Sequence, residues 1–253
     1  MLYPLTNPKH DSRVSNQETK SISHITSNDG YIGGRVYMIA SPIGSFSDIT
    51  LRALEVMKSV DYIICEDTRQ TIKLTRKYNI NKKLISLHQH SSEAKLNFVI
   101  EELKNGRSIA CLSDGGTPNL SDPGAKLNEL AIKNDIKIIP VPGPSPLLAL
   151  ISVAPFACSD FRFLGFFPKK KGREKLAREI SGLKYPVFFF ESPKRVRKTI
   201  SFLKEKIPHK KLLIGRELTK VFEEILVLDL FNVTDDNINR IPEKGEFVLA
   251  IFS

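Results

Sequence analysis

The segment SIACLSDGGTPNLSDPGAKLNELA, residues 108–131, places an apolar run, a loop and a helical repeat in direct succession. The run at 108–113 is short and apolar, as the strands of a sheet buried on both faces are. The loop at 112–124 is rich in glycine and proline, which interrupt strands and helices. After the loop, apolar residues between Leu127 and Ala131 recur at the spacing of one helix face. The segment therefore predicts a strand–loop–helix unit.

The same order of apolar run and helical repeat recurs between residues 35 and 141. Leu51, Leu54 and Met57 have the spacing of residues on one face of a helix. Another expected helix has its apolar face between Leu96 and Leu103. Because helices separate runs that are apolar throughout, we expect a parallel sheet with helices on both faces. The expected strands are RVYMIAS (35–41), VDYIICE (60–66), KLISLH (83–88), SIACLS (108–113) and IKIIPV (136–141).

A second series of apolar runs predicts a second sheet, with strands at 162–167, 186–192, 211–216, 223–230 and 246–252. Helical patterns at 173–182 and 193–206 separate the first three runs, whereas the last two lack a convincing helix between them. We therefore expect an α/β fold whose second sheet is mixed, with both parallel and antiparallel strands. The inferred divisions are a disordered polar leader at 1–34, an N-terminal α/β domain at 35–155 and a C-terminal α/β domain at 156–253.

Positive charge is concentrated in the second half of the chain. The chain has 253 residues and a net charge of +10, and Asp160–Lys220 alone holds 18 Lys and Arg against 6 Asp and Glu. This surplus favours a polyanionic partner, although a basic surface also serves solubility. No unbroken apolar stretch has membrane-spanning length, which excludes a transmembrane protein. The three cysteines, and the pair His88 and His90, lack the spacing of metal ligands, so we expect no metal site.

Three loops rich in glycine and proline follow expected strands of the first sheet, at 40–48, 112–124 and 141–146. The carboxyl ends of parallel strands share one edge of the sheet, which is where open α/β sheets bind ligands. None of the loops has the G-x-G-x-x-G or G-x-x-x-x-G-K-[ST] pattern, which disfavours a nicotinamide oxidoreductase and a phosphate-loop enzyme. One such loop is explained by turn formation alone, but three at one edge predict a binding site.

The residues EDTR, 66–69, close the second expected strand. Asp67 is a suitable N-cap for the helix that follows. Capping does not require Glu66 and Arg69 as well, so both are candidates for the site.

Seven motifs in order resemble those of a known family. They are SPIGSFSDITLRALEVMKSVDYIICEDTRQT, SDGGTPNLSDPG, VPGPSPLLALISVA, GFFPKKKGR, FFFESPKRV, RELTKVFEEI and KGEFVLAI, and the resemblance that they carry runs from about residue 34 to residue 252. This set resembles the bacterial 16S ribosomal RNA (cytidine-2′-O)-methyltransferases, which methylate a ribose in the decoding region of the small subunit. That family belongs to the tetrapyrrole methylase superfamily.

The resemblance implies an S-adenosylmethionine cofactor in a cleft between two domains, a cytoplasmic homodimer, and 16S ribosomal RNA in the 30S subunit as partner. Gly115 stands where this family usually has alanine, and Ser45 where it commonly has asparagine. Ser91 and Ser92 replace an Asn-Glu pair, so we assign no catalytic residue there. The candidate cofactor-binding residues are Pro42, Gly44, Ser113, Asp114, Gly116, Thr117, Ser121, Pro144 and Ser145.

Methyl transfer to a ribose hydroxyl requires the reacting atoms to be held in line, and a base that removes the hydroxyl proton helps it. The carboxylates of Glu66, Asp67 and Glu217 are alternatives for this base, and Lys220 is another if its pKa is depressed. The candidate catalytic residues are Glu66, Asp67, Arg69, Glu217 and Lys220. An ion pair at a strand end explains Arg216 and Glu217 equally well.

Two basic clusters, PKKKGREK at 168–175 and SPKRVRK at 192–198, have the residues that bind RNA phosphates, although such runs are commonly solvated helix faces. The candidate RNA-binding residues are Lys169, Lys170, Lys171, Arg173, Lys194, Arg195 and Arg216. Two other functions remain open: a tetrapyrrole C-methyltransferase with the same cofactor, and a non-catalytic RNA-binding factor. The dispersed positive charge disfavours the former, and the intact loops disfavour the latter.

Overall fold

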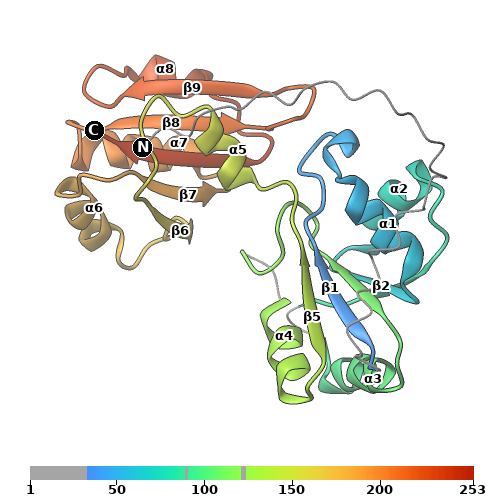
Figure 1. The fold of residues 1–253 in the computed structure, drawn as a ribbon. Helices are drawn as coiled ribbons and strands as arrows, with labels where there is room; N and C mark the ends of the chain where they lie inside the picture. The colour runs from blue at the N-terminus through green and yellow to red at the C-terminus, as the bar shows by residue number, and fades with distance from the viewer. Residues whose placement is uncertain (1–32, 89–90, 121–123) are drawn as a thin grey trace, which may run out of the picture. The chain divides into compact units, whose positions relative to one another are not determined.

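The first five strands form one parallel sheet, which confirms the prediction from the alternating pattern (Figure 1). The computed structural model describes residues 33–88, 91–120 and 124–253. The strand order is β3-β2-β4-β1-β5, so the chain reverses direction across the sheet between β1 and β4. The strands are β1 (Arg35–Ile39), β2 (Tyr62–Cys65), β3 (Lys83–Ser86), β4 (Ile109–Leu112) and β5 (Lys137–Val141).

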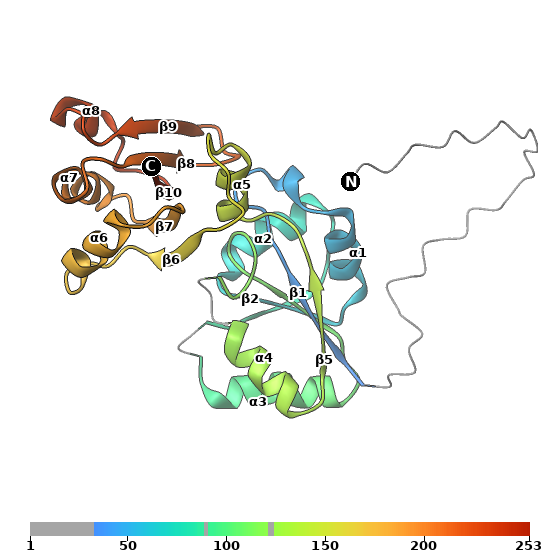
Figure 2. The same cartoon turned by 60° about the vertical axis from the view of Figure 1, so that its left-hand side comes forward.

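Helices cover both faces of this sheet, α1 and α2 on one side and α3 and α4 on the other (Figures 1 and 2). A buried cluster packs Leu96, Val99 and Leu127 from α3 and α4 against β1, β2 and β4. The helices are α1 (Leu51–Ser59), α2 (Thr68–Lys77), α3 (Glu93–Lys104) and α4 (Gly124–Lys133), and a short 3₁₀ turn, η1 (Phe46–Asp48), precedes α1.

The expected apolar face of α1 is wrong at Leu51, whose side chain is 79% exposed, whereas Met57 is fully buried. Three-residue steps drift by about 60° each around a helix with 3.6 residues per turn, so Leu51 and Met57 lie about 120° apart. The buried residues are instead Ala53, Val56 and Met57. Leu51 is the first residue after the Thr50 N-cap, at the end of the helix.

The last five strands form a mixed sheet in the order β6-β7-β10-β8-β9, as expected. Strand β6 pairs with β7 in parallel, and the remaining pairs are antiparallel. The large cluster on one face of this sheet contains Phe167, Phe189 and Leu249. The strands are β6 (Arg162–Phe166), β7 (Val187–Glu191), β8 (Lys211–Arg216), β9 (Glu224–Asp229) and β10 (Phe247–Phe252).

A short helix, α8 (Asp235–Arg240), lies between β9 and β10, where the sequence pattern predicted none. Its first turn is fixed by a capping box, in which Thr234 and Asn237 exchange hydrogen bonds between side chains and backbone. Only Ile238 of its six residues is buried, so no apolar repeat reveals it. The two other helices of this half, α6 (Arg173–Ser181) and α7 (Val196–Lys206), agree with the predicted segments.

Helix α5 (Pro146–Ser152) connects the two sheets and packs on the second one, where Leu147 and Leu150 join Phe188 and Leu213 in a buried cluster. The inferred division between 35–155 and 156–253 stays a prediction. Helix α5 lies before residue 156 and already packs on the second sheet. Nearly all of the expected leader at 1–34 lies outside the described residues. Within the described part of the chain, each helix is too short or too polar to cross a membrane.

We expect Met57→Ala to lower the free energy of unfolding by about 2–5 kcal/mol, because it leaves a cavity in a buried site. The matched variant Leu51→Ala, on the same helix, is expected to change it by less than about 0.5 kcal/mol. Urea denaturation followed by circular dichroism measures both. Equal destabilisation of the two variants would contradict the burial of α1 described above.

Candidate active site

A cavity of about 730 Å³ lies where the carboxyl ends of β1, β2 and β4 meet the second sheet. Pockets of this size hold cofactors and drug-sized ligands. The first sheet contributes the loops after these three strands, together with one face of α2. The second sheet contributes the end of β7 with its following turn, the loop after β8 and the start of β10. The pocket is therefore built from both halves of the chain.

The loops after β1 and β4 are tied to each other by buried hydrogen bonds. The backbones of Ser41 and Gly116 exchange two hydrogen bonds of 3.0 Å. The Ser41 hydroxyl donates to the carbonyl of Ser113 at 2.8 Å, and the Ser113 hydroxyl donates to the carbonyl of Gly116 at 2.6 Å. Gly116 has φ +90°, and a Cβ there would lie 2.8 Å from Cδ of Pro146. Only glycine fits this position without strain.

Four of the predicted cofactor-binding residues line the cavity: Pro42, Gly44, Ser113 and Asp114. The others that the structure describes support the loops beside it: Gly116 through the bridge to Ser41, Thr117 through a 3.2 Å hydrogen bond to the carbonyl of Pro144, and Ser145 as the N-cap of α5. Ser121 lies outside the described residues.

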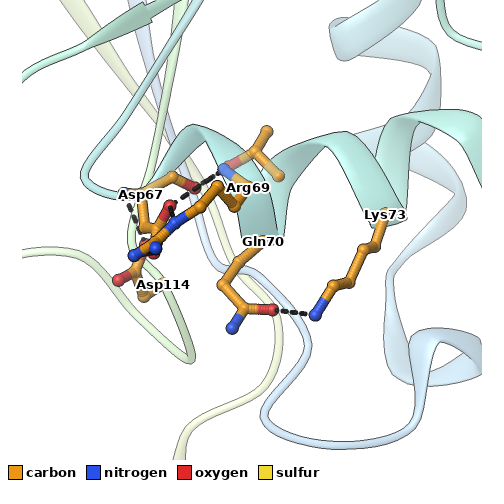
Figure 3. A network of polar contacts seen from close by, with 6 residues as sticks. Asp67, Arg69, Gln70, Lys73 and Asp114 are labelled. Carbon is orange, nitrogen blue, oxygen red and sulfur yellow. Dashed lines mark hydrogen bonds and ion pairs between the residues drawn. The ribbon is translucent and has the colours of Figure 1, made fainter.

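The EDTR residues lie at the N-terminus of α2, and Figure 3 shows Asp67 and Arg69 there. Asp67 is the N-cap, as the sequence suggests, and accepts a 2.9 Å hydrogen bond from the backbone of Arg69. The Arg69 guanidinium binds the same carboxylate, with Nη2 2.7 Å from Oδ2. These contacts lower the pKa of Asp67 to about 2. Asp114 accepts a 2.9 Å hydrogen bond from the backbone of Asp67, so the β4 loop is tied to α2.

Glu66 lines the same wall of the cavity, next to Asp67. Burial raises the pKa of Glu66 above its usual value, and the negative charge of Asp114 raises it further. A carboxylate with a raised pKa is a better proton acceptor than one with a lowered pKa, such as Asp67. Arg69 does not line the cavity, and its side chain is 86% exposed.

The loop RELTK, 216–220, forms part of the opposite wall through Leu218 and Lys220. Its backbone is strained, since Glu217 and Thr219 have φ +49° and +63°. The Lys220 ammonium lies 3.0 Å from Oε1 of Glu217 and 3.2 Å from Oε2 of Glu246. The strained turn therefore places a paired lysine beside the cavity.

The contacts of Lys220 raise its pKa. Burial alone would lower its pKa, but the hydrogen bond to Glu217 and the charge of Glu246 outweigh burial and raise it. Burial would likewise raise the pKa of Glu217, but the backbone of Glu246 and the Lys220 ammonium outweigh it and lower the pKa. The lysine-base hypothesis requires a depressed pKa, which these contacts disfavour, and the role of Lys220 stays a prediction.

The basic clusters divide into exposed lysines and anchored arginines. Lys169, Lys170, Lys171 and Lys194 are exposed, whereas Arg173 and Arg195 are partly buried. Arg195 binds Glu191 and the carbonyl of Phe167, and Arg173 donates to Thr199. Arg216 binds Glu224 at 2.7 Å and the carbonyls of Phe222 and Lys244. RNA binding by all seven residues stays a prediction.

Several lining residues were missed by sequence reasoning. From α2 these are Gln70, Thr71 and Leu74, and from the second sheet Glu191 to Pro193 and Gly245 to Val248. The segments ESP and KGEF belong to motifs that resemble those of the known family, and this resemblance was the only indication in the sequence that they form part of a site. Neither segment has a composition that is typical of a site. Among the described residues, the structure has no cluster of three or more potential metal ligands. His88 is described, and His90 lies outside the described residues.

Comparison with known proteins assigns the chain to a family. A model of the tetrapyrrole (corrin/porphyrin) methylases matches residues 35–234. The ribosomal RNA small subunit methyltransferase I of Leptospira biflexa is 42% identical over 222 residues, which cover 86% of this chain and 90% of the relative. The chain belongs to the ribosomal RNA small subunit methyltransferase I family. A second member, from Neisseria meningitidis serogroup A, is 39% identical over 231 residues, 89% of this chain and 78% of the relative.

The fold of this family member is shared with solved tetrapyrrole methyltransferases. The uroporphyrin-III C-methyltransferase of Thermus thermophilus, solved in complex with S-adenosylhomocysteine, aligns with a TM-score of 0.61 over 87% of this chain and 98% of that chain. The sequence identity is 15%.

We expect Gly44→Ala to disrupt the pocket, because its Cβ would lie 2.5 Å from Cγ of Lys220 and 2.8 Å from the carbonyl oxygen of Leu218. Overpacking of this kind costs about 1–3 kcal/mol. Gly115→Ala is the control, since its Cβ would have its nearest neighbour, the carbonyl oxygen of Pro42, at 3.7 Å.

Thermal melting and calorimetric titration with S-adenosylmethionine measure both variants. The expected result is a lower melting temperature and weaker binding for Gly44→Ala, with Gly115→Ala close to the wild type. Wild-type behaviour of Gly44→Ala would show that the contact with the RELTK loop does not shape the pocket.

Proposed function

We propose that the protein transfers a methyl group from S-adenosylmethionine to the ribose 2′-hydroxyl of a cytidine in the decoding region of 16S ribosomal RNA. The observation that carries this proposal is the composition of the cavity wall. Glycine and proline loops stand beside the carboxylate of Glu66 on one side, and Lys220 stands on the other. The names of the relatives support the methylation of ribosomal RNA.

The cavity fits the proposed cofactor. Pro42, Ile43 and Leu112 provide apolar surface, and the nearby carboxylates of Glu66 and Asp114 complement a cationic sulfonium and an amino group. When bound, S-adenosylmethionine supplies an electrophilic methyl group, and the residues of this chain provide position and proton transfer.

Glu66 is the residue that we assign as proton acceptor for the ribose hydroxyl. It lines the cavity and has a raised pKa, whereas Asp67 is held ionised by Arg69 and Glu217 by Lys220. The Lys220 ammonium can donate a hydrogen bond to the substrate and so orient its sugar. Phe166 and Phe190 add apolar surface to this side of the cavity.

The exposed lysines near the cavity favour RNA over a tetrapyrrole as substrate. The loop with Lys169–Lys171 follows Phe166, and Lys194 follows Ser192 and Pro193, which line the cavity. Lysines spread over two loops suit a chain of separated phosphates better than one compact polycarboxylate. A C-methyltransferase acting on tetrapyrroles remains the alternative, as does an RNA-binding factor without catalysis.

We further propose that the protein acts as a cytoplasmic homodimer. Strand β9 is at the edge of its sheet, and Val227 on it is 52% exposed. Phe222 and Phe231, on either side of the strand, are 70% and 76% exposed. An unpaired edge with exposed apolar side chains supports association with a second copy.

The experiment that tests the function combines the purified protein, tritiated S-adenosylmethionine and 30S subunits from cells that lack the enzyme. We expect label in 16S ribosomal RNA, recovered after nuclease digestion as 2′-O-methylcytidine. Cofactor binding with no label in RNA would exclude the proposed substrate and favour a tetrapyrrole. Failure to bind the cofactor would leave the non-catalytic alternative.

We expect Glu66→Gln to lower the rate of methyl transfer by about 10²- to 10⁴-fold while S-adenosylmethionine still binds, because it removes a proton acceptor without changing the shape of the wall. The rate should also fall in the wild type as the pH drops through the raised pKa of Glu66. Asp114→Asn removes one cause of that raised pKa, so the fall should move to lower pH.

Measurement of kcat/KM against pH tests both effects. Asp67→Asn is the control for the pH shift, because asparagine also caps helices and the Asp67 charge is not a cause of the Glu66 shift. A Glu66→Gln enzyme with wild-type kcat would rule out Glu66 as the base.

A further inference from the structure

A buried carboxylate lies between the two lysine-bearing loops. Glu191 is the last residue of β7, and its side chain is fully buried. Its Oε1 accepts a 2.6 Å hydrogen bond from the backbone of Ser192. Its Oε2 accepts hydrogen bonds from Nη2 of Arg195 at 2.8 Å and from the hydroxyl of Thr199 at 2.7 Å. Both oxygens are therefore bound within the protein, which limits the role of Glu191 as a proton acceptor.

The contacts of Glu191 fix the turn that carries Lys194. Ser192 and Arg195, which flank Pro193 and Lys194, both bind the carboxylate. The backbone of Arg195 also donates to the carbonyl of Ser192 at 3.0 Å, which closes the turn. Lys194 is exposed at its tip.

The same network fixes both ends of the loop that carries Lys169–Lys171. At the start, Arg195 donates to the carbonyl of Phe167, whose own backbone N–H donates to the carbonyl of Phe190 at 3.0 Å. At the end, Arg173 donates from Nη2 to the Thr199 hydroxyl at 3.3 Å. The Arg173 guanidinium also lies 4.3 Å from the centre of the Phe202 ring and 5.4 Å from that of Phe167.

We propose that Glu191 is a positioning residue for RNA, whose buried carboxylate holds both lysine loops in place beside the active site. The proposal rests on the function proposed above. Loops whose ends are fixed lose less conformational entropy when their lysines bind phosphates, which strengthens binding. Because Glu191, Ser192 and Pro193 also line the cavity, the anchored lysines stand at its edge.

The variant Glu191→Gln distinguishes a positioning role of Glu191 from an effect of net charge on RNA binding. The substitution adds one positive charge to the protein, so an effect of net charge alone would leave RNA affinity unchanged or increase it. Loss of positioning predicts the opposite, because a glutamine cannot accept all three hydrogen bonds and the loops are released. We expect the affinity for a single-stranded RNA fragment of the decoding region to fall about tenfold.

The salt dependence of binding gives a second readout that reduced stability alone does not produce. For a single-stranded RNA, the steepness of log K against log salt concentration falls by about 0.7 for each phosphate that the protein no longer neutralises. We expect Glu191→Gln to neutralise one or two phosphates fewer than the wild type, which lowers the steepness by about 0.7 to 1.4. Circular dichroism tests whether the variant is folded, and calorimetry tests whether it still binds S-adenosylmethionine.

Two further variants make the result decisive. Glu179→Gln, in the exposed pair of Arg162 and Glu179, makes the same change of charge outside the network, and we expect RNA affinity to be unchanged or higher. Thr199→Val cuts the link between Glu191 and Arg173 without a change of charge, and should weaken RNA binding in the same direction. It serves as the test if Glu191→Gln does not fold.

Weaker RNA binding with a smaller salt slope, in folded protein that binds the cofactor, would support the proposal. The proposal would be overturned if RNA binding were unchanged or tighter and its salt dependence were unchanged. This holds for whichever of Glu191→Gln and Thr199→Val is folded. A wild-type protein that binds the cofactor but not the RNA would instead overturn the proposed function itself.

Discussion

The hydrogen-bonded bridge between Ser41 and Gly116 determines where the active-site loops lie. It joins the loops after β1 and β4, the two neighbouring strands between which the chain reverses direction across the first sheet. Buried hydroxyls of Ser41 and Ser113 reinforce it, so neither loop can move without leaving buried polar groups unpaired. Gly44, just beyond the bridge, contacts the RELTK loop of the second sheet. The wall of the cavity thus depends on this short connection.

Charge is distributed unequally around the cavity. Asp67 is neutralised by Arg69, and Lys220 is shared by Glu217 and Glu246. These ion pairs keep their members charged. Charged, paired side chains of this kind can stabilise the cavity wall and orient a substrate. Glu66 is in a different environment, because burial and the charge of Asp114 both raise its pKa. Two carboxylates next to each other in the chain therefore acquire different chemical roles from their surroundings.

The sequence predicted the strands well, because each of them lies in a short apolar run. It failed at Leu51, where spacing alone could not distinguish the buried face of α1 from the helix end, and at α8, which is held by a capping box rather than by apolar contacts. Asp67 was recognised as a cap from its position. The raised pKa of Lys220 could not be predicted, since it depends on a hydrogen bond to Glu217 within a strained turn and on the charge of Glu246, which is distant in the sequence and close only in the fold.

Glu191 shows why the remaining part of the site could not be predicted from the sequence. A glutamate at the end of an apolar strand has the same local pattern whether its side chain is in solvent or fully buried, and only the fold brings Arg195 and Thr199 to it. A fold of this kind does not select a substrate by itself. The first sheet supplies the bridged loops that suit a cofactor, whereas the anchored lysine loops and the RELTK turn come from the second sheet. Under the proposed function, the choice between an RNA and a tetrapyrrole therefore depends on how firmly a few buried contacts hold those loops.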